Sequence, residues 1–319
     1  MKLVFFSAKP YDKEFFEAGN KHYDFELEFW ETHLGLHVAD AVKSGTDAVC
    51  VFVNDKVTAD VIEILAGKGV KILALRCAGF NNLDIAAAEK YGMRVCRVPA
   101  YSPQAVAEHA VAMLLTLNRK THKAYNRVRE QNFSLTGLIG FNLFGKTVGV
   151  IGTGKIGAAF CKIMMGFGCL VNASDPLEDE ALKSSGVNYL PFHEVIANAD
   201  IISLHCPLTP ENHHLINSAS IASMKKGVVL INTSRGGLIS ALGIDVYEQE
   251  EKLFFRDLSS AIIGDDDIQR LISFPNVLIT GHQAFFTAEA LSEIASCTLE
   301  TVSALLKNET IKNTSAILL

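Results

Sequence analysis

Short apolar runs alternate with segments of helical periodicity over the first hundred residues of this chain. The runs that predict strands, rich in β-branched and aromatic residues, lie at 2–7, 26–30, 48–53, 70–76 and 94–97. The segments in which apolar residues recur at helical spacing, and which predict helices, lie at 13–20, 58–67 and 83–91. Strands that alternate with helices are typical of a parallel sheet covered by helices, so the pattern predicts an α/β domain.

The pattern breaks at residues 98–103 and then resumes. Pro99 and Pro103 end the preceding strand and favour the start of a helix. One long helix is predicted at 104–129, followed at 132–144 by an irregular, apolar-rich loop that is a candidate contact with another subunit. Beyond residue 146 the predicted strands lie at 148–151, 170–175, 200–204, 227–233, 243–247 and 277–280, and the predicted helices at 158–167, 192–198, 218–223 and 288–307.

Length and composition limit the classes of protein to consider. A chain of 319 residues suits two domains of ordinary size. The formal net charge of −6 and the pI of about 5.9 argue against a nucleic-acid partner. Seven cysteines without a C-x-x-C pair are typical of reduced thiols, and we therefore expect a cytoplasmic protein. Because no run of 18 apolar residues occurs, we expect no membrane partner.

The sequence GTGKIG at 152–157 follows an apolar strand and precedes an apolar helical segment. In that context the G-x-G-x-x-G pattern predicts a dinucleotide-binding turn. Gly152 would allow the sharp turn, Gly154 would let a pyrophosphate approach the backbone, and Gly157 would let helix and strand pack closely. The helix N-terminus would offer N–H groups and a partial positive charge to the phosphate. A structural turn without a ligand is the alternative interpretation.

An acidic residue at the end of the next predicted strand strengthens the prediction of a dinucleotide site. Asp175 lies 18 residues past Gly157, close to the spacing of about 20 at which a carboxylate binds the adenosine ribose hydroxyls. No arginine follows within residues 176–180, which favours NAD over NADP as the cofactor. The alternative is a solvated acid in an ordinary loop.

Three polar residues that follow predicted strands form a candidate catalytic set. Arg235 offers a rigid fork for a carboxylate or carbonyl oxygen, and a histidine such as His282 suits proton transfer near neutral pH. Glu250 beside that histidine would stabilise the imidazolium. Each residue also has a structural interpretation. Arg235 could be a surface residue, His282 a buried histidine with its hydrogen bonds satisfied, and Glu250 a solvated residue of an acidic run. Together with the glycine turn, the set predicts hydride transfer.

Seven motifs spread over nearly the whole chain resemble those of one enzyme family. They are ALRCAGFNN (74–82), VPAYSPQAVAEHA (98–110), GTGKIG (152–157), SLHCPLTPEN (203–212), INTSRGG (231–237), DVYEQE (245–250) and TGHQAFFT (280–287). With them the chain resembles the NAD-dependent D-2-hydroxyacid dehydrogenases, and most of all the fermentative D-lactate dehydrogenases. The resemblance implies two Rossmann-like α/β domains with parallel sheets: a discontinuous, flavodoxin-like substrate domain (1–100 and 287–319) and a central NAD-binding domain (101–286).

The resemblance also implies a role for each residue at a matching motif position. His282 resembles the family's acid/base, Glu250 its carboxylate partner and Arg235 the arginine that binds and polarises the 2-oxo acid. The residues implied to surround the substrate are Ala78 and Gly79, through their N–H groups, and Tyr101 and Phe285, which would line the pocket. Those implied to bind NAD are Gly152, Gly154, Lys155, Ile156, Gly157, Asp175, His205, Pro207, Thr233 and Asp245. The implied reaction is reversible reduction of pyruvate to D-lactate by NADH.

The interval between Arg235 and Glu250 is shorter than in the family, which places a helix there. The strands at 227–233 and 243–247 should be parallel neighbours, and such a crossover takes at least about 10–12 residues. Only nine residues, 234–242, are available. Three interpretations are open: the sequence omits a segment, the chain has a true deletion, or the strand assignment is wrong. A true deletion predicts weak or absent turnover, because Glu250 could not face His282.

Other functions fit parts of the same sequence. A dehydrogenase for another D-2-hydroxy acid would share every motif, because the sequence does not fix the pocket volume. An NAD-responsive binding protein, similar to corepressors related to this family, would not require the arginine, glutamate and histidine that this chain retains. We expect a homodimer or homotetramer with a small-molecule substrate. We expect no metal site at His213 and His214, which lack a nearby carboxylate or cysteine pattern, and a solvated loop at 265–267.

Overall fold

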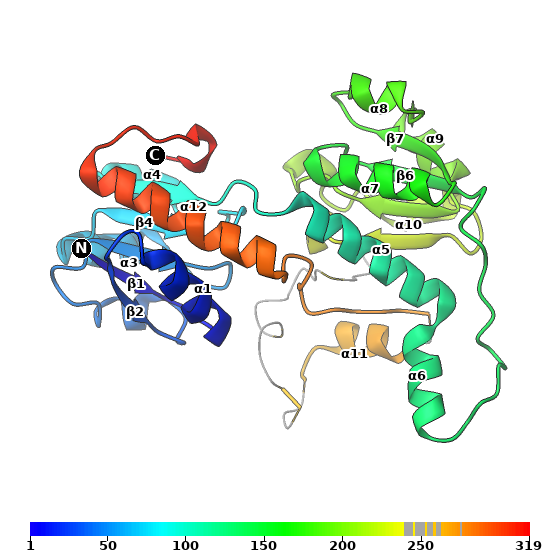
Figure 1. The fold of residues 1–319 in the computed structure, drawn as a ribbon, viewed down its shortest axis with the longest axis horizontal. Coiled ribbons are helices and arrows are strands. Elements are labelled where there is room, and N and C mark those ends of the chain that lie inside the picture. The colour runs from blue at the N-terminus through cyan, green and yellow to red at the C-terminus, as the bar shows by residue number, and fades with distance from the viewer. Residues whose placement is uncertain (239–244, 246–252, 254–257, 260–262, 275) are drawn as a thin grey trace. The chain divides into compact units, whose positions relative to one another are not determined.

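A computed structural model describes the chain except for residues 239–244, 246–252, 254–257, 260–262 and 275. The chain forms two compact units (Figure 1). The first contains Met1–Ser102 and Phe286–Leu319, and the second contains Pro103–Phe285. Each unit is described by itself.

The first unit is built on a sheet of five parallel strands. The strands are β1 (Lys2–Phe5), β2 (Glu26–Phe29), β3 (Ala48–Val51), β4 (Ile72–Leu75) and β5 (Arg94–Arg97). Their spatial order is β2-β1-β3-β4-β5, and each neighbouring pair is parallel. This is the order of the flavodoxin-like fold. The apolar runs therefore form strands because both faces of a parallel sheet are buried.

Helices cover both faces of the first sheet (Figure 1). They are α1 (Pro10–Asn20), α2 (Leu36–Ala39), α3 (Ala59–Gly67), α4 (Ile85–Lys90) and α12 (Ala288–Lys307). On one face α12 packs against α1, β4 and β5, and the ring of Phe5 lies 4.6 Å from that of Phe16 in α1. On the other, Ile62 of α3 shares a buried cluster with Val49 and Leu73. Two segments far apart in sequence thus complete one core.

The two edges of the first sheet differ, because charged residues lie on β2 and a segment outside the sheet lies along β5. Along β2, Glu26 and Glu28 form ion pairs with Lys2 at 3.1 and 2.7 Å. Along β5, Ile317 forms an antiparallel bridge with Cys96, and the Leu318 N–H donates to the Val95 carbonyl at 2.9 Å. Residues 317–319 therefore line the outer side of β5.

The second unit is also built on a parallel five-stranded sheet. Its strands are β6 (Thr147–Ile151), β7 (Leu170–Ser174), β8 (Asn188–Tyr189), β9 (Ile201–Leu204) and β10 (Val229–Asn232), in the order β10-β9-β6-β7-β8. Its helices are α5 (Pro103–Arg119), α6 (Thr121–Arg129), α7 (Lys155–Gly166), α8 (Glu180–Ser184), α9 (Phe192–Asn198), α10 (Ser218–Ser223) and α11 (Asp266–Ser273). Counted from β6, the order is the 3-2-1-4-5 of dinucleotide-binding folds. The predicted α/β class with parallel sheets is confirmed.

Three local predictions are wrong. The helix expected at 104–129 is two helices, because Lys120 has a left-handed backbone (φ 49°) that separates α5 from α6. Residues 277–280 form no strand, and Leu278 instead packs on the core of the second unit. The loop expected at 265–267 is the start of α11, where the Asp265 carboxylate caps the helix by accepting from the Ile268 N–H. The strand expected at 243–247 lies, apart from Asp245, outside the described residues.

A buried arginine ties together the carboxyl ends of three strands in the first unit. Arg76 follows β4 and is only 1% exposed. Its guanidinium donates to the carbonyls of Phe6 and Ser7, both at 2.9 Å, and to the buried Asp12 carboxylate at 3.1 Å. Its Cζ also lies 4.9 Å from the ring centre of Phe52, just after β3. The positive charge is therefore held by hydrogen bonds inside the unit.

Among the described helices, none combines the length and the apolar composition that crossing a membrane requires.

Candidate active site

The order of strands in the second sheet reverses between β6 and β9. In open α/β sheets, ligands bind at such a switch point, beyond the carboxyl ends of the strands. Gly152 follows β6 there, with φ +92°, and a side chain at this position would meet the Cys206 backbone N at 2.6 Å. The loop after β6 therefore contacts the loop after β9 at Gly152, where a side chain would not fit.

The glycine turn has the shape that a dinucleotide requires. A Cβ on Gly157 would lie 1.9 Å from the Gly152 carbonyl oxygen, so only glycine allows this approach of α7 to the turn. A Cβ on Gly154 would meet no atom within 4 Å. Open space therefore lies at Gly154, the N-cap of α7, where a pyrophosphate would meet the helix N-terminus formed by Lys155 and Ile156.

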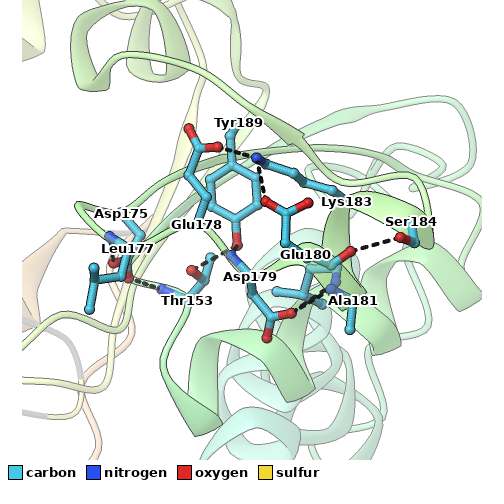
Figure 2. Close-up of polar contacts among 11 residues, drawn as sticks. Thr153, Asp175, Leu177, Glu178, Asp179, Glu180, Ala181, Lys183, Ser184 and Tyr189 are labelled. Carbon is cyan, nitrogen blue, oxygen red and sulfur yellow. Dashed lines mark hydrogen bonds and ion pairs between the residues drawn. The ribbon is translucent and has the colours of Figure 1, made fainter.

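Asp175 lies just beyond β7 and is bound to the glycine turn (Figure 2). Its Oδ2 accepts from the Thr153 N–H at 2.6 Å and its Oδ1 from the Leu177 N–H at 2.8 Å. The Tyr189 hydroxyl donates to Thr153 Oγ1 at 2.9 Å. Two N–H bonds leave free lone pairs on the carboxylate, which can accept hydrogen bonds from ribose hydroxyls.

Two buried polar atoms at this edge have no hydrogen-bond partner within the described part of the chain. They are Nδ1 of His205, which follows β9, and Oγ1 of Thr233, which follows β10. Buried polar atoms are nearly always hydrogen-bonded, and each unmet one costs about 1–3 kcal/mol. His205 lies against the glycine turn and Thr233 at the same edge of the sheet, so these residues fit the cofactor predicted from the sequence.

Burial lowers the pKa of His205 to about 3, so its imidazole is neutral in the folded protein. The unfolded chain binds a proton near pH 6.5, so stability falls as the pH drops from 6.5 toward 3, by up to about 1.4 kcal/mol per pH unit. In the wild-type structure Ser203 Oγ lies 2.9 Å from His205 Nε2. His205→Gln removes the titrating imidazole and keeps a polar atom near that hydroxyl. Urea unfolding measured from pH 7 to pH 4 should show that the free energy of unfolding falls less steeply with pH in the variant than in the wild type. An equal pH dependence in both proteins would contradict this prediction.

A buried asparagine shapes the loop that presents Arg235. The Asn232 side chain accepts from the Ser234 N–H at 3.0 Å and donates to the Arg235 carbonyl at 2.9 Å. Ser234 Oγ donates to the Leu204 carbonyl at the end of β9, at 2.8 Å. Arg235 is exposed, and its Nη1 donates to the Ser234 carbonyl at 2.8 Å. Asn232 was not among the predicted site residues, although an asparagine at the end of a strand is a common signal for such a turn.

The loop of His282 is fixed next to this edge through Asp245. His282 has a left-handed backbone (φ 54°) and is half-buried. The carboxylate of Asp245 accepts from the N–H groups of Gln283 and Ala284, both at 3.1 Å. The Asp245 N–H donates to the Asn232 carbonyl at the end of β10 at 3.2 Å. Asp245 thus connects the loops of Arg235 and His282.

The remaining predicted site residues fall in different parts of the structure. Ala78, Gly79 and Tyr101 belong to the first unit, where Arg97 Nη1 donates to the Ala78 carbonyl at 2.7 Å. Phe285 is buried in the second unit, and Pro207 is exposed after β9. Glu250 lies outside the described residues. No group of three metal-binding side chains occurs among the residues that the structure places.

Comparisons with known proteins agree with this geometry. The model of the D-isomer specific 2-hydroxyacid dehydrogenase, NAD binding domain, matches residues 111–284. D-lactate dehydrogenase of Escherichia coli (strain K12) is 50% identical, over 98% of this chain and 99% of its own. The pyruvate reductase of Chlamydomonas reinhardtii has a TM-score of 0.92 at 42% identity, over 98% of both chains. An NAD-complexed dehydrogenase from Lactobacillus delbrueckii ssp. bulgaricus has a TM-score of 0.80 at 28% identity, over 100% of both.

The chain belongs to the D-isomer specific 2-hydroxyacid dehydrogenase family. It is an NAD-dependent enzyme of that family. The alignment with the Escherichia coli enzyme spans 327 positions, more than the 319 residues of this chain, so the relative has residues that this chain lacks. This agrees with the prediction that a segment is missing relative to the family.

Proposed function

We propose that this enzyme reduces pyruvate to D-lactate with NADH, reversibly. The observation that supports the proposal is the joining of the Arg235 and His282 loops, through Asn232 and Asp245, beside a glycine turn that fits NAD. The names of two relatives, a D-lactate dehydrogenase and a pyruvate reductase, support this substrate.

The bound cofactor supplies the hydride that adds to C2 of the 2-oxo acid. The Arg235 guanidinium binds the substrate carboxylate and 2-oxo oxygen and draws electron density toward that oxygen. The N–H groups of Ala78 and Gly79 hold the carboxylate. His282 donates a proton to the oxygen on C2, so that pyruvate, NADH and one proton give D-lactate and NAD⁺. We assign Glu250 to stabilise the imidazolium, on its motif position alone.

The same proposal assigns the cofactor contacts. Gly152, Gly154 and Gly157, with the N-terminus of α7, would hold the pyrophosphate, and Asp175 would bind the ribose hydroxyls and repel a 2′-phosphate. Thr233 and His205 would bind polar groups of the cofactor through their unpaired atoms. Tyr101 and Phe285 would line a small apolar pocket that suits a methyl group.

The test is to mix the purified protein with pyruvate and NADH or NADPH and to follow cofactor oxidation and product chirality. We expect D-lactate, and faster turnover with NADH. Faster turnover with a bulkier 2-oxo acid than with pyruvate would show that the enzyme prefers another member of the same substrate class. NADH binding without turnover of any 2-oxo acid would favour a binding protein or a damaging deletion.

We also propose that the chain forms a homodimer or homotetramer through residues 132–144. This segment is irregular, and its large apolar residues are exposed. Leu135 is 81% and Ile139 is 85% exposed, and Phe133 and Phe144 are exposed as well. Large apolar side chains gathered in one exposed segment are typical of an interaction surface. Leu135→Asp with Ile139→Asp should shift the mass in light scattering to that of one 34.7 kDa chain. Leu177→Asp, at an exposed leucine elsewhere, should leave the mass unchanged; a monomeric wild type would contradict the proposal.

A further inference from the structure

His109 of α5 is a motif residue that neither the cofactor contacts nor the proposed reaction uses. Its Nε2 lies 3.4 Å from Asp245 Oδ1 and 3.3 Å from the Thr280 hydroxyl. One helical turn further along α5, the sulfur of Met113 lies 3.8 Å from the same hydroxyl. One face of α5 therefore contacts both Asp245 and the segment that leads into His282.

Asp245 is fully buried, and groups of this region contact its carboxylate from several sides. Besides His109, it accepts from the Thr280 hydroxyl and from the N–H groups of Gln283 and Ala284. Burial by itself raises the pKa of Asp245, but the bonds with His109 and Thr280 outweigh it and hold the pKa below its usual value. The group is therefore a charged carboxylate with donors on several sides, not an acid kept neutral by burial.

The two N–H groups that Asp245 binds come directly after His282 in the chain. His282 itself has the left-handed backbone conformation, which is unfavourable for a non-glycine residue and persists only where its surroundings impose it. The bonds from Asp245 to Gln283 and Ala284 impose that turn from its buried side. Moving Asp245 would therefore move the imidazole of His282.

We propose that His109 and Asp245 are positioning residues that fix the turn of His282, with His109 Nε2 donating toward Asp245 and holding its carboxylate beneath Gln283 and Ala284. The inference rests on the proposed role of His282 as the proton donor. It goes beyond the motif-based assignment of Asp245 to NAD, because it gives that carboxylate a role in proton transfer and adds a residue of α5.

The experiment compares His109→Leu, which loses the donor, with His109→Gln, which places an amide N–H near the position of Nε2. For His109→Leu we expect kcat to fall about tenfold to hundredfold, since a displacement of about 1 Å at a reacting group has that effect, with KM for NADH within about twofold of wild type. His109→Gln should recover most of the loss. Amide hydrogen exchange in a peptide covering 281–286 should accelerate in His109→Leu and in Asp245→Ala.

His193→Leu is the matched control, because this histidine is 79% exposed in its side chain and belongs to none of the seven motifs. It should change neither kcat nor exchange. A His109→Leu enzyme with normal kcat and a raised KM for NADH would overturn the inference in favour of a cofactor role. Unchanged exchange at 281–286 would overturn it as well. Full turnover by His282→Ala would instead refute the proposed function, and the exchange measurement would still test the positioning pair.

Discussion

Replacement of His282 by alanine is expected to lower kcat for pyruvate reduction by about 10²–10⁴, the range typical for loss of a general acid. The side chain is half-buried in a turn whose backbone is anchored by Asp245, so the substitution removes the imidazole without removing the anchor. NADH should still bind, because the glycine turn, Asp175 and Thr233 are unchanged. Steady-state kinetics with pyruvate, together with an NADH fluorescence titration, measures both quantities.

His193→Ala provides the control for that experiment, and its kcat should equal that of the wild type. Turnover by His282→Ala within a few-fold of wild type would contradict the assignment of the proton donor. A wild-type chain that binds NADH without any turnover is the result expected of a true deletion between Arg235 and Glu250. That outcome would agree with an alignment longer than the chain itself.

Replacement of Arg76 by methionine is expected to destabilise the first unit by about 3–5 kcal/mol, the cost typical of removing one partner of a buried ion pair. The Asp12 carboxylate would remain buried without its cation, and the carbonyls of Phe6 and Ser7 would lose their donors. The methionine fills much of the volume, so the loss measures charge and hydrogen bonding more than a cavity. Urea unfolding monitored by far-UV circular dichroism gives the free energy of unfolding.

A second arginine of the same unit supplies the control. Arg94 forms an exposed hydrogen bond with Asn308 at 3.0 Å, so Arg94→Met should change stability by less than about 1 kcal/mol. Combining Arg76→Met with Asp12→Leu should recover part of the loss, because no unpaired charge would then be buried. A loss below about 1 kcal/mol for Arg76→Met alone would show that the pair is dispensable.

The fold could be predicted from the sequence where local signals agree with tertiary structure. Apolar runs bounded by turns predicted nine of the ten described strands, because burial on both faces of a parallel sheet demands such runs. The break at Lys120 had no signal, since a lysine is not a residue that favours a left-handed backbone. The start of α11 did have one, an aspartate ahead of an apolar residue at helical spacing, and was misassigned to a loop.

The residues of the candidate site could be predicted from the sequence, but the hydrogen bonds that hold its loops together could not. Motif positions singled out Arg235 and His282, whereas the contacts that hold their loops join residues far apart in the chain. His109 and Thr280, for example, are separated by 171 positions, and no local pattern relates them. The family resemblance implied a cofactor contact for Asp245, whereas its carboxylate accepts from the N–H groups of Gln283 and Ala284 only because of tertiary packing.

The residues that line the edges of the first sheet also bear on how the protein resists aggregation. An open edge of a parallel sheet offers unpaired backbone groups to which a second chain can add a strand. Residues 317–319 occupy those groups along β5, whereas β2 carries the charges of Glu26 and Glu28, which pair with Lys2 of the neighbouring β1. Residues 317–319 therefore prevent a second chain from adding a strand along β5.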